Sequence, residues 1–134
     1  MKVLFVCRGN VGRSQMAQAL FEKLSGLKSF SVGTRVNFEG QKIGDIEPAK
    51  FVISSMKKYG SDISTNFVKQ LTPEMISEFD KIIVMAESET VPNYLKGNKK
   101  AEFWEIEDPK GKDENFHRKT ILQIEKKILE LIKK

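Results

Sequence analysis

The chain has 134 residues, of which 40% are hydrophobic and 31% charged, so we expect one compact domain over residues 1–134 with a sizeable core. No apolar run approaches the roughly 20 residues that a membrane-spanning helix needs, so we expect no membrane partner. The net charge of +5 comes from lysines that interleave with acids. This pattern favours a solvated surface or an attraction for anionic substrates over nucleic-acid binding.

The chain contains one cysteine, Cys7, and one histidine, His117. A single cysteine excludes an intramolecular disulfide and a multi-cysteine zinc site, and it indicates a reducing, cytoplasmic compartment. We give His117 no catalytic role, because a lone histidine is most often a surface residue or one with satisfied hydrogen bonds.

The first half of the chain predicts strands that alternate with helices. Residues 2–7 form a continuous apolar run, too short for a signal peptide and typical of a strand buried on both faces. The elements that follow are a helix over 14–25 stopped by Gly26, a strand over 29–33, a loop over 34–46, and a helix from Pro48 to Gly60 with Phe51, Val52, Ser55 and Met56 on one face.

The second half continues the alternation. Thr72-Pro73-Glu74 is a helix start signal, with a capping hydroxyl before a proline at the first helical position. The elements that follow are a strand over 80–86, a short helix over 88–96, a strand over 101–106, and a long helix from Asp113 with Ile121, Ile124, Ile128, Leu129 and Ile132 along one side.

This alternation favours an α/β fold built on an open parallel sheet. Ligands of such sheets bind beyond the carboxyl ends of the strands. The loop after the first strand is therefore the place where we expect the chemistry.

That loop contains residue types that suit the binding of a phosphoryl group. Its sequence is Cys7-Arg8-Gly9-Asn10-Val11-Gly12-Arg13-Ser14. The helix start offers backbone N–H groups and a positive dipole end, and the glycines let those groups converge on an anion. The same field stabilises a thiolate at Cys7. Arg13 supplies a planar bidentate donor, and Ser14 can donate to the thiolate.

Two simpler interpretations remain open at this stage. A single cysteine at a strand end is commonly an inert small hydrophobic residue, and glycine turns between strands and helices are frequent. The context favours the catalytic interpretation, because the loop follows a predicted strand and opens a predicted helix.

Asp108 is the candidate general acid. A thiolate that cleaves a phosphate ester needs an acid for the leaving oxygen, and the same group can later act as base on water. Asp108-Pro109 lies just beyond a predicted strand, where Pro109 would stiffen the backbone. An ordinary turn before the last helix is the alternative.

These two elements together resemble the low-molecular-weight protein tyrosine phosphatase family, which includes thioredoxin-coupled arsenate reductases. Segments 31–34 and 79–85 also resemble the family's sequence, so the likeness covers essentially the whole chain. The resemblance implies a three-layer sandwich with a four-stranded parallel sheet, a phosphate-binding loop after the first strand, and double displacement without metal or other cofactor.

The resemblance also implies roles for individual residues. Cys7 is the nucleophile, Arg13 the phosphate clamp, and Asp108 the general acid and base. The residues from Arg8 to Ser14 bind phosphate, which is both product and inhibitor. Asn10, Ser14 and Ser31 support the loop.

Three departures from the family pattern bear on the substrate. Gly12 stands where eukaryotic members often carry a second cysteine, so Cys7 has no local partner against overoxidation. Lys110-Gly111 replace the aromatic residues that follow Asp-Pro in many members, which favours a smaller or more anionic substrate, although Phe38 could supply a wall. Asn66 stands in for a loop-supporting histidine.

The resulting prediction is a phosphatase acting on phosphate monoesters, with phosphotyrosine in proteins as the expected substrate and a small phosphate ester as the other. One alternative is an arsenate reductase that uses an external thiol, since residues 13–17 resemble the reductase version of the helix start. A phosphocysteine carrier would need neither Arg13 nor Asp108. The last alternative is a non-catalytic anion-binding or partner-binding domain.

Overall fold

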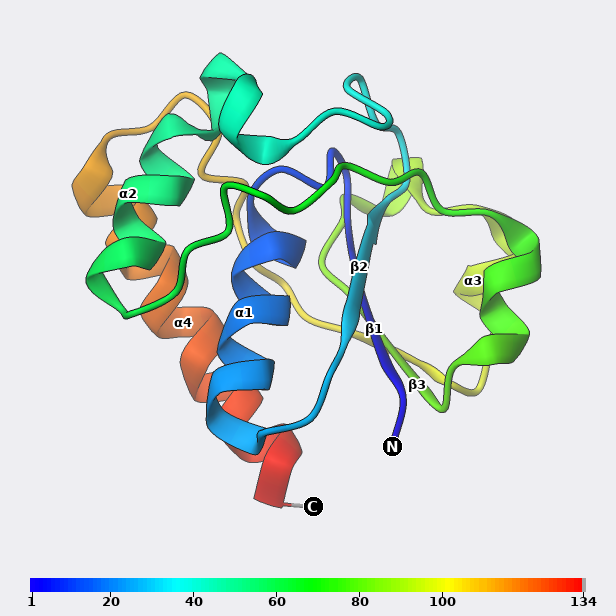
Figure 1. Cartoon of the computed structure of the whole chain (residues 1–134). Coiled ribbons are helices and arrows are strands. Elements are labelled where there is room, and N and C mark those ends of the chain that lie inside the picture. Colours follow the sequence, from blue (N-terminus) through cyan, green and yellow to red (C-terminus); the bar gives the residue numbers. More distant parts are fainter. Residues whose placement is uncertain (134) are drawn as a thin grey trace.

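The computed structural model describes residues 1–133 as a parallel sheet between two layers of helices (Figure 1). Its strands are β1 (Val3–Cys7), β2 (Phe30–Gly33), β3 (Lys81–Val84) and β4 (Ala101–Phe103). Its helices are α1 (Arg13–Ser25), α2 (Lys50–Lys58), α3 (Asn93–Lys96) and α4 (Glu114–Lys133). Short 3₁₀ helices span Ile43–Asp45, Glu47–Ala49, Pro73–Glu78 and Ser88–Thr90.

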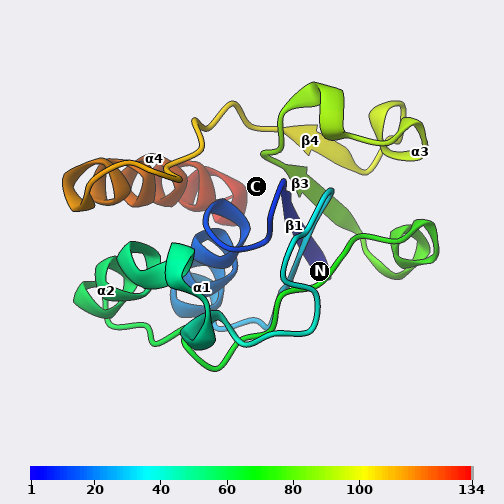
Figure 2. The ribbon, with the colours of Figure 1, turned by 90° about the horizontal axis from the view of Figure 1, so that it is seen from above.

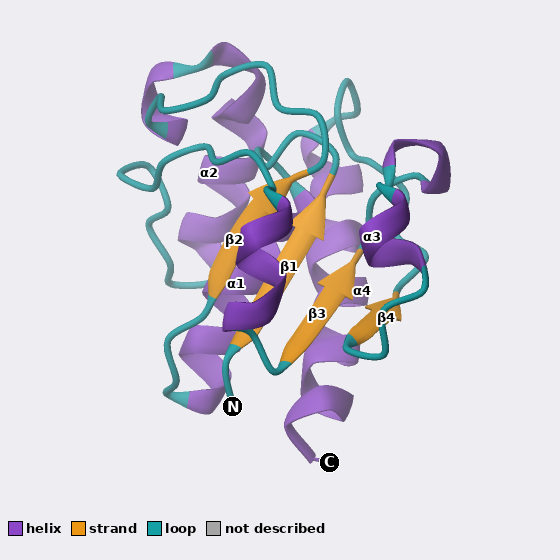
Figure 3. Ribbon diagram, turned by 90° about the vertical axis from the view of Figure 1, so that its right-hand side faces the viewer, coloured by secondary structure: helices purple, strands orange, loops and turns teal. Residues whose placement is uncertain are grey.

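The four strands run parallel in the order β2-β1-β3-β4, which confirms the predicted fold class. All strand arrows point the same way in Figure 3. The register pairs Cys7 with Gly33 and Val6 with Val84. The carboxyl ends of β1, β2 and β3 therefore meet at one edge of the sheet, where α1 begins.

The two faces of the sheet are covered unequally. Figure 2 shows α1, α2 and α4 on one side of the sheet and α3 on the other. All five residues of β1 are buried, with Val3 and Phe5 in the core beneath α1, α2 and α4, and Leu4 and Val6 in the opposite core. A strand buried on both faces reads as a continuous apolar run, which is why residues 2–7 could be recognised from sequence.

Two residues predicted to lie on the apolar faces of helices are exposed. Phe51 is 36% exposed and Leu129 is 42% exposed. Phe51 directly precedes the buried Val52, and Leu129 directly follows the buried Ile128. Neighbours in a helix lie about 100° apart around its axis, so a residue next to a buried one can face solvent. The buried row of α4 runs through Ile121, Ile124, Ile128 and Leu131 instead.

Several predicted boundaries also differ. The start signal at Thr72 opens a 3₁₀ helix over Pro73–Glu78 and not an α-helix, and the Thr72 side chain makes no capping hydrogen bond. β3 and β4 are shorter than the predicted strands over 80–86 and 101–106, and β4 lies at the edge of the sheet, where it pairs only with β3. Among the helices in residues 1–133, none combines the length and apolar character needed to cross a membrane.

Candidate active site

The loop between β1 and α1 turns sharply to bring the start of α1 beneath the end of β1. Asn10 adopts φ 57°, the left-handed region that asparagine tolerates better than most residues. Gly12 precedes α1 and has no side chain to cap the helix, so the first-turn N–H groups are left for another acceptor. This geometry builds an anion-binding concavity next to Cys7.

Cys7 lies in a buried hydrogen-bond network at the base of this loop. Its Sγ is 3.1 Å from Ser14 Oγ and accepts a hydrogen bond from the Asn10 backbone N–H at 3.3 Å. The Asn10 side-chain amide donates to Ser14 Oγ at 2.7 Å, so the Ser14 hydroxyl hydrogen can turn toward a Cys7 thiolate. The network thus gives the sulfur two donors.

Asn10 also ties the loop to a distant part of the chain. Its side-chain oxygen accepts a hydrogen bond from the Lys69 backbone N–H at 2.8 Å. Gln15 donates to the Asn10 carbonyl and accepts from the Asn66 amide at 3.1 Å. Asn66 therefore supports the loop through Gln15, in line with the role expected for it.

Gly33, at the end of β2, leaves room for the loop. A Cβ at this position would lie 2.6 Å from the Arg8 carbonyl oxygen and 2.9 Å from the Asn10 nitrogen. Because both atoms belong to backbone, the clash could be relieved only by moving the loop. A glycine at this position is therefore part of how the site is built.

Arg13 is buried beneath the loop, 2% exposed, and its guanidinium is held by four residues. Nη1 donates to the carbonyl oxygens of Met85 at 2.5 Å and Ile106 at 2.9 Å, and to Glu87 at 2.9 Å. Nη2 donates to Glu87 at 3.2 Å and lies 3.5 Å from Asp108 Oδ2. Nε is buried and has no partner, which leaves one donor for an oxyanion.

The charges around Arg13 reinforce its cationic state. Burial lowers the pKa of Arg13, but the hydrogen bond with Glu87 and the negative charges of Cys7, Asp108 and Glu87 outweigh it, so the pKa lies above its ordinary value. Burial raises the pKa of Glu87, yet the hydrogen bond from Arg13 and the charges of Arg13 and Arg8 hold it below its ordinary value. Glu87 therefore stays ionised beside the clamp.

Asp108 follows β4 and reaches the same edge of the sheet. Its Oδ2 pairs with Arg13, and its Oδ1 accepts the Lys110 backbone N–H at 3.0 Å. The side chain is 37% exposed, so solvent and a substrate can reach it. This placement suits a group that exchanges protons with a leaving oxygen and then with water.

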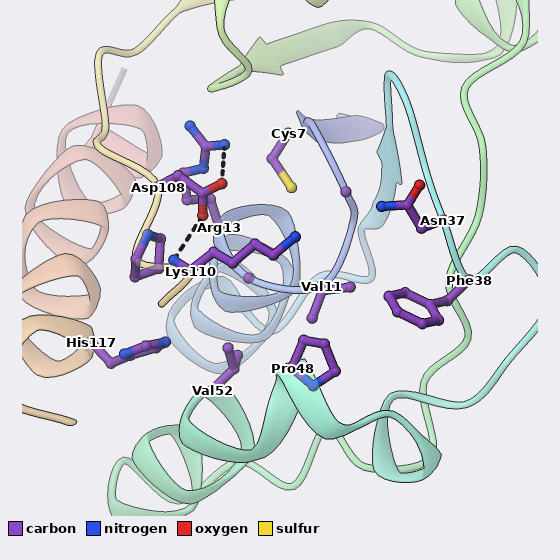
Figure 4. A pocket seen from close by; sticks show the side chains of 13 residues that line it. Cys7, Val11, Arg13, Asn37, Phe38, Pro48, Val52, Asp108, Lys110 and His117 are labelled. Atoms are coloured by element: carbon purple, nitrogen blue, oxygen red, sulfur yellow. Dashed lines mark hydrogen bonds and ion pairs between the residues drawn. The ribbon is translucent and has the colours of Figure 1, made fainter. Parts of the chain in front are cut away.

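Cys7, Arg13 and Asp108 line one cavity, together with residues from three other segments (Figure 4). Phe38 forms one wall, as expected for a replacement of the missing aromatic residues. The remaining lining residues are Gly9, Val11, Gly12, Asn37, Pro48, Val52, Pro109, Lys110 and His117. Within residues 1–133, no group of three histidine, cysteine, aspartate or glutamate side chains is arranged to hold a metal ion.

Some residues lie elsewhere than sequence reasoning placed them. The Ser31 hydroxyl donates to Gln18 on α1 at 2.7 Å and not to the loop, because Ser31 lies two pairing positions before the end of β2. The Arg8 side chain is exposed. Of the two expectations for His117, the buried one with a hydrogen-bond partner applies: its Nδ1 lies 2.8 Å from the Asp113 carbonyl oxygen, and the residue lines the cavity.

Sequence reasoning missed Glu87, Gln15 and Gly33. Glu87 follows the apolar run of β3 at a carboxyl end of the sheet, the edge where ligands bind, and that position could have pointed to it. Gln15 and Gly33 give no comparable signal, because their roles depend on what the fold packs against them.

Comparison with known proteins gives a consistent result. The family model described as low molecular weight phosphotyrosine protein phosphatase matches residues 2–134. A human low molecular weight phosphotyrosine protein phosphatase is 39% identical over 89 residues, covering 64% of this chain and 55% of the human protein. The chain thus spans about half the length of that relative.

Two further relatives extend over more of the chain. An arsenate reductase from Staphylococcus haemolyticus is 28% identical over 111 residues, covering 82% of this chain and 79% of the reductase. The solved structure of a low molecular weight protein tyrosine phosphatase from T. tengcongensis is 29% identical, has a TM-score of 0.83, and covers 99% of this chain and 98% of that one. The chain belongs to the low molecular weight phosphotyrosine protein phosphatase family.

Proposed function

We propose that the chain is a phosphatase that hydrolyses phosphate monoesters, with phosphotyrosine in proteins as its substrate. The observation that carries this proposal is the single cavity lined by Cys7, Arg13 and Asp108. The buried Arg13 Nε without a partner adds to it, since an orphaned donor at this place fits a phosphoryl oxygen. The family supports the same reaction class.

The mechanism runs in two displacements. The loop N–H groups and Arg13 bind the phosphoryl oxygens, and the Cys7 thiolate attacks phosphorus while the bond to the leaving oxygen breaks. Asp108 gives that oxygen a proton. In the second step water attacks phosphorus, Asp108 takes a proton from the water, and the phosphorus–sulfur bond breaks. Inorganic phosphate leaves the loop, and as product it competes with substrate.

The test is hydrolysis of p-nitrophenyl phosphate and of a phosphotyrosine peptide under reducing conditions with a metal chelator present. We expect turnover by the native chain and none by Cys7→Ser. Acid quenching during turnover should trap a phosphorylated protein whose label maps to Cys7. Full activity after Cys7→Ser would refute the nucleophile, and an inactive native chain that is folded and reduced would refute the phosphatase assignment.

Arsenate reduction is the second candidate, and the match to the Staphylococcus haemolyticus arsenate reductase favours it. Cys7 would form a bond to arsenic with loss of water. An external thiol would then attack the Cys7 sulfur, so that the sulfur–arsenic bond breaks, its electron pair stays on arsenic, and arsenite leaves a mixed disulfide on Cys7. A second external thiol would attack that disulfide, which frees Cys7 and yields a disulfide of the two external thiols. Cys7 is the chain's one cysteine, so both electrons must come from outside. Arsenate-dependent consumption of a small thiol, measured beside phosphate-ester hydrolysis, decides between the two reactions.

A further inference from the structure

We propose that Lys110 selects substrates in which an acidic residue lies next to the phosphorylated residue. This inference rests on the proposed phosphatase function and concerns the same cavity. Lys110 belongs to the lining of the cavity that holds Cys7. In Figure 4 its side chain extends from the Asp108 turn across the cavity toward the side of Val11.

The Lys110 amine forms no ion pair with any residue of the described range 1–133. Arg13, by contrast, is paired with Glu87 and Asp108. The amine is thus a cation at the mouth of the site whose partner must come from the substrate or the solvent.

The position of Lys110 on the chain places this charge on the leaving-group side. Its backbone N–H donates to Asp108 Oδ1, so the residue is anchored to the side chain that must reach the leaving oxygen. A phosphoryl group bound by the loop would lie against the buried Arg13, whereas Lys110 is exposed. The Lys110 amine beside the leaving group therefore interacts more strongly with charges on the leaving group than with the phosphoryl oxygens.

The other walls suit a substrate with an apolar body. Much of the lining is apolar: Val11, Phe38, Pro48, Val52 and Pro109. The titratable side chains in the lining are Cys7, Arg13, Asp108, Lys110 and His117. An aromatic ring can lie against these walls while a neighbouring carboxylate meets the Lys110 amine. The chemistry that fits is therefore a phosphorylated aromatic residue with an acidic neighbour.

The experiment compares two phosphotyrosine peptides of equal length, one with glutamate and one with glutamine beside the phosphotyrosine. For the native chain we expect kcat/KM to be about two- to fivefold higher with the glutamate peptide, as for a charge pair near solvent, with a smaller ratio at high salt. Lys110→Met should bring the ratio to one, and Lys110→Glu should reverse it. Lys112→Met is the matched control, because this amine lies over the Phe116 ring outside the cavity, and it should keep the native ratio.

Two outcomes would overturn the inference: a native ratio of one, and a ratio unchanged by Lys110→Met. If Lys110→Met leaves the ratio unchanged but lowers kcat/KM equally for both peptides, the amine acts on the phosphoryl group. Binding of both peptides to the Cys7→Ser chain, measured by calorimetry, gives the same ratio without turnover. A native chain that binds with this preference but hydrolyses nothing would refute the proposed function alone.

Discussion

Replacing Glu87 with glutamine tests how the clamp is held. Glu87 accepts two hydrogen bonds from the Arg13 guanidinium, at 2.9 and 3.2 Å. Glutamine keeps one acceptor oxygen but removes the negative charge, while the carbonyl oxygens of Met85 and Ile106 still hold Nη1. Hydrogen bonds to charged groups contribute about 1.5–3 kcal/mol, and loss of one partner of a fully buried ion pair costs about 3–5 kcal/mol.

We expect the loss in free energy of unfolding to fall within the lower of these two ranges. The Glu87 side chain is 33% exposed, so water screens part of the interaction. We therefore expect Glu87→Gln to lower the free energy of unfolding by about 1.5–2.5 kcal/mol. For a chain of 134 residues that corresponds to a fall in Tm of about 5–9 °C. Glu89→Gln, two residues away at an exposed position, is the control and should leave Tm within about 2 °C.

The pH dependence gives a second, independent check. The pKa of Glu87 is held below its ordinary value of 4.5, against the effect of burial, by the Arg13 hydrogen bond and nearby positive charges. A carboxylate of this kind stabilises the fold fully above its unfolded pKa, and the stabilisation is lost as pH falls through the folded pKa. The Tm difference between the native chain and Glu87→Gln should therefore be full near neutral pH and shrink below about pH 4.5.

Thermal unfolding followed by circular dichroism or calorimetry across this range measures both effects. Equal Tm values for the native chain and Glu87→Gln at neutral pH would refute the claim that Glu87 holds the clamp. A Tm difference that persists unchanged at strongly acidic pH would refute the electrostatic explanation.

Three further substitutions test the loop and the acid. Gly33→Ala should lower kcat/KM for p-nitrophenyl phosphate more than tenfold, because its Cβ would lie 2.6 Å from the Arg8 carbonyl oxygen. Gly97→Ala, where a Cβ meets nothing within 4 Å, is the control, and equal activities of the two variants would contradict the clash. Asn10→Ala should be about 1 kcal/mol less stable in denaturant unfolding than Asn10→Gly, since both lose the side-chain bonds but only alanine is strained at φ 57°; the reverse order would count against backbone strain. Asp108→Asn should lower kcat about 10²–10³-fold with phenyl phosphate and much less with p-nitrophenyl phosphate, and equal losses would exclude an acid role.

The parts of the fold that sequence predicted well are those with strong local signals. The helix over 14–25 ends as predicted at Gly26, which adopts the left-handed conformation that a helix C-terminus favours. Thr72-Pro73 carried a comparable start signal, yet only a 3₁₀ helix forms there. Phe51 and Leu129 were placed on the apolar faces of their helices, yet both are exposed, because spacing alone does not fix the width of a buried helix face.

The residues of the candidate site also fall into those with a local sequence signal and those without one. Cys7, Arg13 and Asp108 could be named because each lies where the end of an apolar run, a glycine or a proline marks a strand end or a helix start. Glu87 and Asn66 hold their partners across 74 and 51 residues, respectively. No local pattern encodes contacts of that span: Asn66 could be named only through the family resemblance, and the place of Glu87 after β3 marks the edge of the sheet but not the Arg13 contact.

The contacts of Arg13 also determine when, during synthesis, the site can exist. Its acceptors at Met85 and Ile106 are 72 and 93 residues later in the chain. At about 5–20 residues per second, a ribosome adds Ile106 roughly 5–20 seconds after Arg13. During that interval the nascent chain carries Cys7 and Arg13 without all the acceptors that hold the guanidinium, and an unfinished product that stops before Ile106 should have the thiol but lack the proposed phosphatase activity.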